Sequence, residues 1–187
     1  NSGAVQVSTG GNHTCAVTEA GGVECWGGDK YGQTDVPVDL QSSGAVEVSA
    51  GSLHTCAVTD SGGIECWGDT LSGQTDVPAD LQSSGAVQVA AGEYHTCAVT
   101  DTGGVECWGD DSSGETDVPA DLRDSGAVQV SAGEQHTCAV TDSGGVECWG
   151  SEGSRKTDVP ANLRDSGAVH VAAGEYHTCA VKESGGI

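Results

Sequence analysis

One unit of 41 residues repeats along the whole chain without an insertion or a deletion. The phrase Ser-Gly-Ala-Val begins each copy, at Ser2, Ser43, Ser84, Ser125 and Ser166. The 187 residues therefore divide into four complete units, 2–42, 43–83, 84–124 and 125–165, and a partial fifth, 166–187. Because no linker or change of composition separates the copies, we interpret residues 1–187 as a single repeat array.

Each unit has the pattern of several short β-strands. In Ala127–Gly133 apolar and polar residues alternate, which is typical of a half-buried strand. His136–Gly150 has two β-favouring runs around a glycine-containing turn and predicts a hairpin. Thr157–Ala161 contains a proline, so it belongs at a strand edge or in a loop. No segment has a helical period, and the predicted fold class is all-β.

Composition limits both the core and the partners. The chain has no Phe and no Met, so Val, Ala, Leu and half-cystine must supply most of the buried surface. Six basic residues against 28 acidic ones give a net charge of −22, which argues against binding to nucleic acid or anionic lipid. No apolar run approaches the ~20 residues that a membrane span requires, so we expect no membrane insertion.

Cysteines recur in pairs that are ten residues apart across the predicted hairpin. If the loop is three residues long, as in 19–21, Cys15 lies opposite Cys25 and the two form a cross-strand disulfide, worth roughly 2.5–3 kcal/mol. The predicted disulfide cysteines are Cys15, Cys25, Cys56, Cys66, Cys97, Cys107, Cys138 and Cys148. Zinc is the alternative, although the unit lacks a Cys-x-x-Cys pair. So many cysteines indicate an oxidising compartment.

The ninth cysteine, Cys179, is predicted to be unpaired in this chain. Its partner in the repeat would fall two residues after Ile187. The partial unit therefore indicates either a longer sequence or a contact with a neighbouring chain, to which Cys179 could be linked.

The segment Val48–Pro78, VSAGSLHTCAVTDSGGIECWGDTLSGQTDVP, resembles the repeat of the regulator of chromosome condensation family, in the style of an exported bacterial member. The resemblance extends over essentially the whole chain. It implies that each repeat forms one four-stranded blade of a β-propeller, commonly of seven blades. Four full blades and a partial fifth are too few for such a ring, so we expect part of a larger closed propeller or an open or intermolecular assembly.

The five histidines of the repeated His-Thr-Cys-Ala-Val are candidates for a catalytic base, for metal binding or for a structural role. One base repeated in every unit, without a converging nucleophile, is not an active site. We therefore predict that these histidines bond neighbouring strands or blades, and that the protein is not an enzyme.

The loops that follow each Cys-Trp-Gly differ most between copies, as a recognition surface would. They give the candidate binding residues Lys30, Tyr31, Asp110, Asp111, Arg155 and Lys156. The aspartates before Val-Pro are expected to fix a turn, with Ca²⁺ between blades as the alternative; otherwise no cofactor and no metal are expected. Asn12 begins an Asn-His-Thr sequon and is the candidate for glycosylation.

The function predicted from these features is that of a non-enzymatic structural or interaction scaffold, extracellular, either secreted or at the cell surface. Its expected partners are itself, as a filament or a surface layer, or an extracellular protein or glycan. The alternative is a soluble module that binds protein or glycan through the variable loops after each Cys-Trp-Gly.

Overall fold

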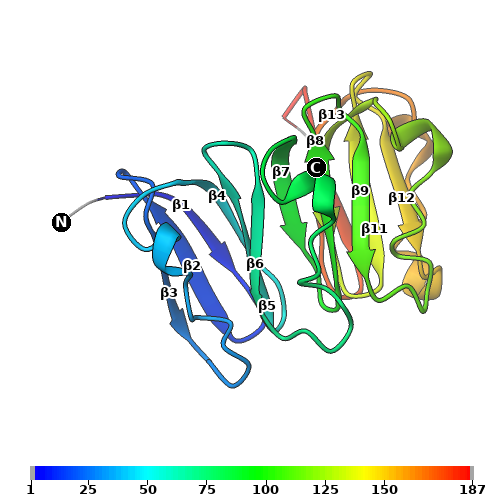
Figure 1. Cartoon of the computed structure of the whole chain (residues 1–187). Coiled ribbons are helices and arrows are strands. Elements are labelled where there is room, and N and C mark those ends of the chain that lie inside the picture. Colours follow the sequence, from blue (N-terminus) through cyan, green and yellow to red (C-terminus); the bar gives the residue numbers. More distant parts are fainter. Residues whose placement is uncertain (1–2, 186–187) are drawn as a thin grey trace.

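The computed structural model describes residues 3–185 and is built from β-sheets and short 3-10 turns (Figure 1). The first four repeats each form a three-stranded antiparallel sheet, and the fifth contributes two strands. We call each sheet a blade. The strands are β1 (Ala4–Thr9), β2 (His13–Thr18), β3 (Val23–Gly27), β4 (Ala45–Ala50), β5 (His54–Thr59), β6 (Ile64–Gly68), β7 (Ala86–Ala91), β8 (His95–Thr100), β9 (Val105–Gly109), β10 (Ala127–Ala132), β11 (His136–Thr141), β12 (Val146–Gly150), β13 (Ala168–Ala173) and β14 (Thr178–Lys182).

Consecutive blades pack against each other through the first two strands of each sheet. The first strands β1, β4, β7, β10 and β13 are in contact from one blade to the next, and β4, β7, β10 and β13 each also contact the middle strand of the preceding blade. Figure 1 shows the sheets following one another from the blue first blade to the red last strands. The prediction of an all-β array with one blade per 41-residue repeat is confirmed.

The hairpin between the second and third strands has the predicted length. Thr18 N donates to Gly22 O at 2.8 Å and so closes a loop of the three residues 19–21. Gly21 has φ +80°, a conformation that glycine adopts without steric cost. With this loop, Cys15 lies directly opposite Cys25 in the register of β2 and β3.

The resemblance implies four strands in each blade, and this is wrong for residues 3–185, in which no sheet has a fourth strand. In its place each of the four complete repeats has a 3-10 turn that follows the Val-Pro pair, and Pro37 itself, with no N–H to donate, precedes the first of these turns. Leu40 ends that turn and is buried against the blade. The turns are η1 (Val38–Leu40), η2 (Ala79–Leu81), η3 (Ala120–Leu122) and η5 (Ala161–Leu163); the fourth repeat adds η4 (Gly153–Arg155).

The hydrophobic core lies between blades and not within any one of them. The first cluster combines Cys15, Val17 and Val23 of the first blade with Val48 and Trp67 of the second. Corresponding clusters join the second blade to the third and the third to the fourth. Without Phe and Met, the sequence did not show where apolar surface would be buried. In the structure, Val, half-cystine and Trp supply it at the contacts between blades.

Within residues 3–185, the structure has no helix that is both long enough and apolar enough to cross a membrane.

Candidate functional site

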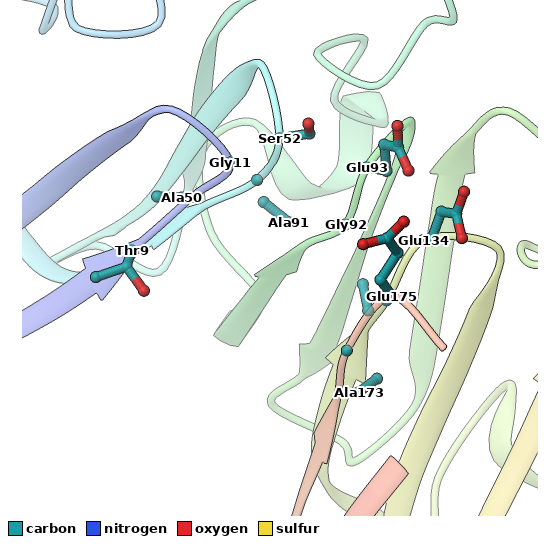
Figure 2. A pocket seen from close by; sticks show the side chains of 15 residues that line it. Thr9, Gly11, Ala50, Ser52, Ala91, Gly92, Glu93, Glu134, Ala173 and Glu175 are labelled. Carbon is teal, nitrogen blue, oxygen red and sulfur yellow. The ribbon is translucent and has the colours of Figure 1, made fainter. Parts of the chain in front are cut away.

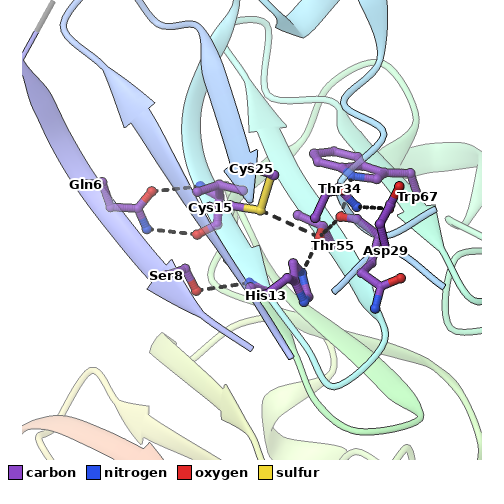
Figure 3. The surroundings of a disulfide bond; sticks show 12 residues. Gln6, Ser8, His13, Cys15, Cys25, Asp29, Thr34, Thr55 and Trp67 are labelled. Carbon is purple, nitrogen blue, oxygen red and sulfur yellow. Dashed lines mark hydrogen bonds between the residues drawn. A yellow bond between two sulfur atoms is a disulfide. The ribbon is translucent and has the colours of Figure 1, made fainter. Parts of the chain in front are cut away.

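A polar contact joins every pair of neighbouring blades, and we call the whole contact between two blades a joint. At the first joint His13 Nε2 lies 2.7 Å from Thr55 Oγ1, while the same hydroxyl donates to Gln33 O at 2.8 Å (Figure 3). Because the single hydroxyl proton of Thr55 is used there, Thr55 must accept from His13, whose proton is therefore on Nε2. Trp67 Nε1 also donates to Gln33 O, at 3.0 Å.

The same His–Thr bond recurs at the next three joints, between His54 and Thr96, His95 and Thr137, and His136 and Thr178. The prediction that the repeated histidines bond neighbouring blades is confirmed for these copies. Its physical basis is the repeat: the histidine begins the middle strand of one blade, and the threonine directly follows the repeated histidine of the next blade.

Burial keeps these histidines neutral. It lowers the pKa of His54 to about 3, with smaller contributions from the neighbouring His95 and His13. Burial likewise lowers the pKa of His95 and of His136 to about 4, and the pKa of His13 falls for the same reason. A histidine that is uncharged and donates to threonine serves to hold the joint.

The four predicted disulfides are all present. They join Cys15 to Cys25, Cys56 to Cys66, Cys97 to Cys107 and Cys138 to Cys148. The zinc alternative is wrong for these cysteines, because each sulfur is bonded to another sulfur. Cys179 is a free, exposed cysteine in the described part of the chain, as predicted.

The ends of the five first strands line an open hollow of about 400 Å³, which we call the inner hollow (Figure 2). Its wall is mostly Gly and Ala, and close contact between blades requires glycine there: a Cβ on Gly51 would lie 2.5 Å from Gly92 O. Three carboxylates, on Glu93, Glu134 and Glu175, lie together at one side of it.

Sequence reasoning missed these three glutamates. Each stands two residues before the repeated histidine, where the first two copies have Gly11 and Ser52. The signal was present as an acidic residue at one repeat position in three successive copies, but only the structure shows that this position faces a shared hollow.

The predicted binding residues in the variable loops are not brought together, since each pair lies on the loop of its own blade. Exposed Lys30 donates to Tyr31 Oη at 3.2 Å, and its Nζ lies 4.9 Å from the centre of the Tyr31 ring. Asp110 accepts from Ser112 Oγ at 2.7 Å, and Asp111 accepts from Thr116 N at 3.1 Å. These contacts fix the loops locally.

Arg155 and Lys156 have different surroundings. Arg155 is exposed and has φ 57°, a left-handed conformation that the other copies give to glycine. Lys156 is buried, with its ammonium 4.0 Å from Glu134 Oε2 and 3.5 Å from Glu175 O. An outward contact of Lys156 with a partner does not fit this position, because its ammonium is already held by Glu134 and Glu175.

The remaining candidates are placed as follows. Asn12 is exposed, so its amide is accessible, and glycosylation stays a prediction. At the turn before Val-Pro, Asp35 N donates to Gly32 O, while Asp29 Oδ1 accepts from Thr34 N at 2.9 Å. Within 3–185, no three His, Cys, Asp or Glu side chains are grouped as metal ligands would be.

The repeats match the family model of the regulator of chromosome condensation (RCC1) repeat at residues 4–33, 45–74, 86–115 and 127–155. The chain belongs to the regulator of chromosome condensation repeat family. None of the curated proteins compared matches this RCC1-repeat chain.

Solved structures of propellers share its fold. The CRINKLY WD40 ectodomain of the Arabidopsis thaliana receptor kinase ACR4 is 25% identical, with a TM-score of 0.74 over 100% of this chain and 63% of that one. Prp20p from Saccharomyces cerevisiae is 18% identical, with a TM-score of 0.77 over 96% of this chain and 56% of that one. Human WBSCR16 is 20% identical, with a TM-score of 0.78 over 99% of this chain and 61% of that one. The RCC1-repeat chain thus spans less than two thirds of the length of each.

Proposed function

We propose that this chain is a non-enzymatic, extracellular interaction module that binds a protein partner at the acidic side of the inner hollow. The observation that carries the proposal is the gathering of Glu93, Glu134 and Glu175 from three blades at one concave surface. Carboxylates arranged in this way complement Lys and Arg side chains, and they would speed the approach of a basic partner.

Two of the three carboxylates are available to a partner. Glu134 faces the buried ammonium of Lys156, whereas Glu93 and Glu175 lie beside the tyrosines that follow them in sequence. Hydrogen bonding to Glu93 and the charge of that carboxylate raise the pKa of the Tyr94 hydroxyl, and Glu175 acts on Tyr176 in the same way. Aromatic and acidic groups side by side suit a cationic side chain with a long apolar stem.

Other observations support the function class and the compartment. Four disulfides in 18.6 kDa are typical of proteins from oxidising environments. Among the structures that share the fold, one is a receptor kinase ectodomain, and Prp20p is described with its binding to Gsp1p and histones. The binding described for Prp20p supports a protein partner for a module with this fold.

The test is titration of the oxidised chain with a Lys- and Arg-containing octapeptide, and with an acidic octapeptide of the same length. We expect salt-dependent binding of the basic peptide alone, weakened about tenfold in the double variant Glu93→Gln, Glu175→Gln. The charge-matched control is Asp39→Asn, Asp121→Asn, which removes two exposed carboxylates that also lie two repeats apart. An equal loss in both variants would mean attraction by net charge and would defeat the proposal.

Self-association is a second candidate, favoured by the exposed face of the first blade. Trp26 and Val7 are 54% and 61% exposed, whereas Trp67 and Val48 at the same repeat positions are 9% and 1% exposed. A blade of another copy would cover this face, and repeated head-to-tail contacts of this kind would build a filament or a layer. Sedimentation should then show concentration-dependent assembly that Trp26→Ser abolishes; a single species for both proteins at all concentrations would contradict this candidate.

A further inference from the structure

Each blade presents the free edge of its first strand, and in the second to fifth blades a side chain from the preceding blade caps that edge. At the first joint the Gln6 amide donates to Val48 O at 2.9 Å and accepts from Val48 N at 2.8 Å (Figure 3). This pair of bonds satisfies both backbone groups of an unpaired strand position, as a neighbouring strand would.

Gln88 and Gln129 do the same at the third and fourth joints. Gln88 donates to Val130 O at 2.9 Å and accepts from Val130 N at 2.7 Å. Gln129 donates to Val171 O at 2.8 Å and accepts from Val171 N at 2.7 Å. The capping residue therefore needs one donor and one acceptor on a planar group.

The second joint departs from this pattern because Glu47 replaces the glutamine. Its carboxyl accepts from Val89 N at 3.3 Å, which is longer than the corresponding bond at the other three joints. An ionised carboxylate has no proton to donate to Val89 O, whereas a protonated carboxyl has one donor and one acceptor, as the glutamine amide has.

We propose that Glu47 makes the joint between the second and third blades sensitive to pH, with two hydrogen bonds when the carboxyl is protonated and one when it is ionised. The other three joints, capped by glutamine, do not have this property. Glu47 does not line the inner hollow, and its pH sensitivity does not depend on the function proposed for that surface.

The surroundings of Glu47 favour the protonated form. Burial raises the pKa of Glu47 from 4.5 to about 7, against a smaller opposite effect of the Val89 N–H. Of the strands packed against β4, namely β1, β2, β5 and β7, only β2 and β5 contain a titratable histidine, and burial lowers the pKa of both His13 and His54. None of these strands contributes a cation that would stabilise the ionised carboxylate.

The sign of the pH effect follows from the raised pKa. In the unfolded chain Glu47 ionises near its ordinary value of 4.5, whereas in the folded chain it holds its proton up to about 7. The stabilisation is fully present below pH 4.5 and is lost as pH rises through about 7, so alkaline conditions weaken this joint.

The test follows the Val89 amide by hydrogen exchange in the oxidised full chain, from pH 5 to pH 8.5. Protection factors remove the intrinsic pH dependence of exchange, and the Val130 amide is the internal reference. We expect protection of Val89 relative to Val130 to fall about tenfold or more across this range, corresponding to one pKa unit or more. The side-chain carboxyl signal of Glu47 should titrate with a midpoint near 7.

Two variants separate the device from general effects of charge. Glu47→Gln should remove the fall at Val89, and Gln88→Glu should create the same fall at Val130. A Glu47 midpoint near 4.5, or Val89 protection that follows Val130 equally in the natural chain and in Glu47→Gln, would overturn the proposal. If Gln88→Glu does not fold, the Glu47 midpoint and the Glu47→Gln comparison still decide.

Discussion

The first and second blades contain nearly the same residues in different surroundings. Both have the strand sequence His-Thr-Cys-Ala-Val-Thr, and in both the cysteine of that strand is fully buried. Yet Trp26 is 54% exposed in the first blade, and Trp67 is 9% exposed in the second. The face with His and Cys packs on the following blade, while the face with Trp and Thr needs a preceding one.

This difference shows that the stability of a blade resides mostly in its joints. One copy of the repeat cannot bury its Trp-bearing face by itself, which is a general property of repeat arrays. The last blade has the complementary arrangement, because Val171 is fully buried against the fourth blade while His177 and Cys179 are exposed. Substitutions at one repeat position in different blades can therefore measure what a neighbour contributes.

The largest expected effect is at tryptophan. Trp67→Ala removes an indole packed between blades together with its bond to Gln33 O, and we expect it to lower the free energy of unfolding by about 3–5 kcal/mol. Trp26→Ala, on the exposed face, should cost about 1 kcal/mol or less. Urea unfolding of both variants under oxidising conditions checks the difference.

Trp108→Ala is the control for position along the chain, because Trp108 is buried in the same way. Its cost should equal that of Trp67→Ala. Equal costs for Trp26→Ala and Trp67→Ala would mean that another blade or another copy covers Trp26 in solution, and repeating the measurement over a range of protein concentrations would identify a second copy.

The sequence predicted what depends on local spacing. The 41-residue period, the hairpin and the Cys15–Cys25 register follow from residues near one another in the chain, and so they could be read directly. The structural role of the repeated histidines could also be predicted. One base in every unit, without a converging nucleophile, excluded catalysis and left a bond between blades.

Much of what the sequence could not predict depends on contacts between residues that are about 20 to 40 positions apart in the chain. To predict the inner hollow, one would have to know that the residue two positions before each repeated histidine, such as Glu93, faces its counterparts in other blades. Burial of Lys156 follows from packing against the next blade, and a loop that varies in sequence gave no sign of it. The fourth strand was expected from the family resemblance alone. Here the proline of the Val-Pro pair has no N–H for a strand ladder, and a 3-10 turn takes the place of the strand.

A smaller effect is expected at the threonine that receives the histidine. Thr96→Val leaves His54 Nε2 without its partner at the second joint, while Gln74 O keeps its bond from Trp108 Nε1, and this should cost about 1–3 kcal/mol. Thr14→Val, at the same repeat position of the first blade, should be nearly neutral, because no blade precedes it in the described chain. Thermal unfolding of the two variants at pH 7 compares them; an equal loss would show that the threonine acts within its own blade.

The smallest expected effect is at Arg155, where a substitution removes backbone strain while the neighbouring blades stay in place. Arg155 has φ 57° where Gly32, Gly73 and Gly114 have φ near 77° in the other copies. A side chain in this region is strained by about 1–2 kcal/mol, partly offset by the greater freedom of glycine in the unfolded chain, so Arg155→Gly should stabilise by about 0.5–1 kcal/mol. The reciprocal variant Gly114→Arg should destabilise the third blade by a similar amount. Paired denaturation curves check both signs, and a loss of stability in Arg155→Gly would mean that the arginine side chain makes a contact stronger than the strain of its backbone.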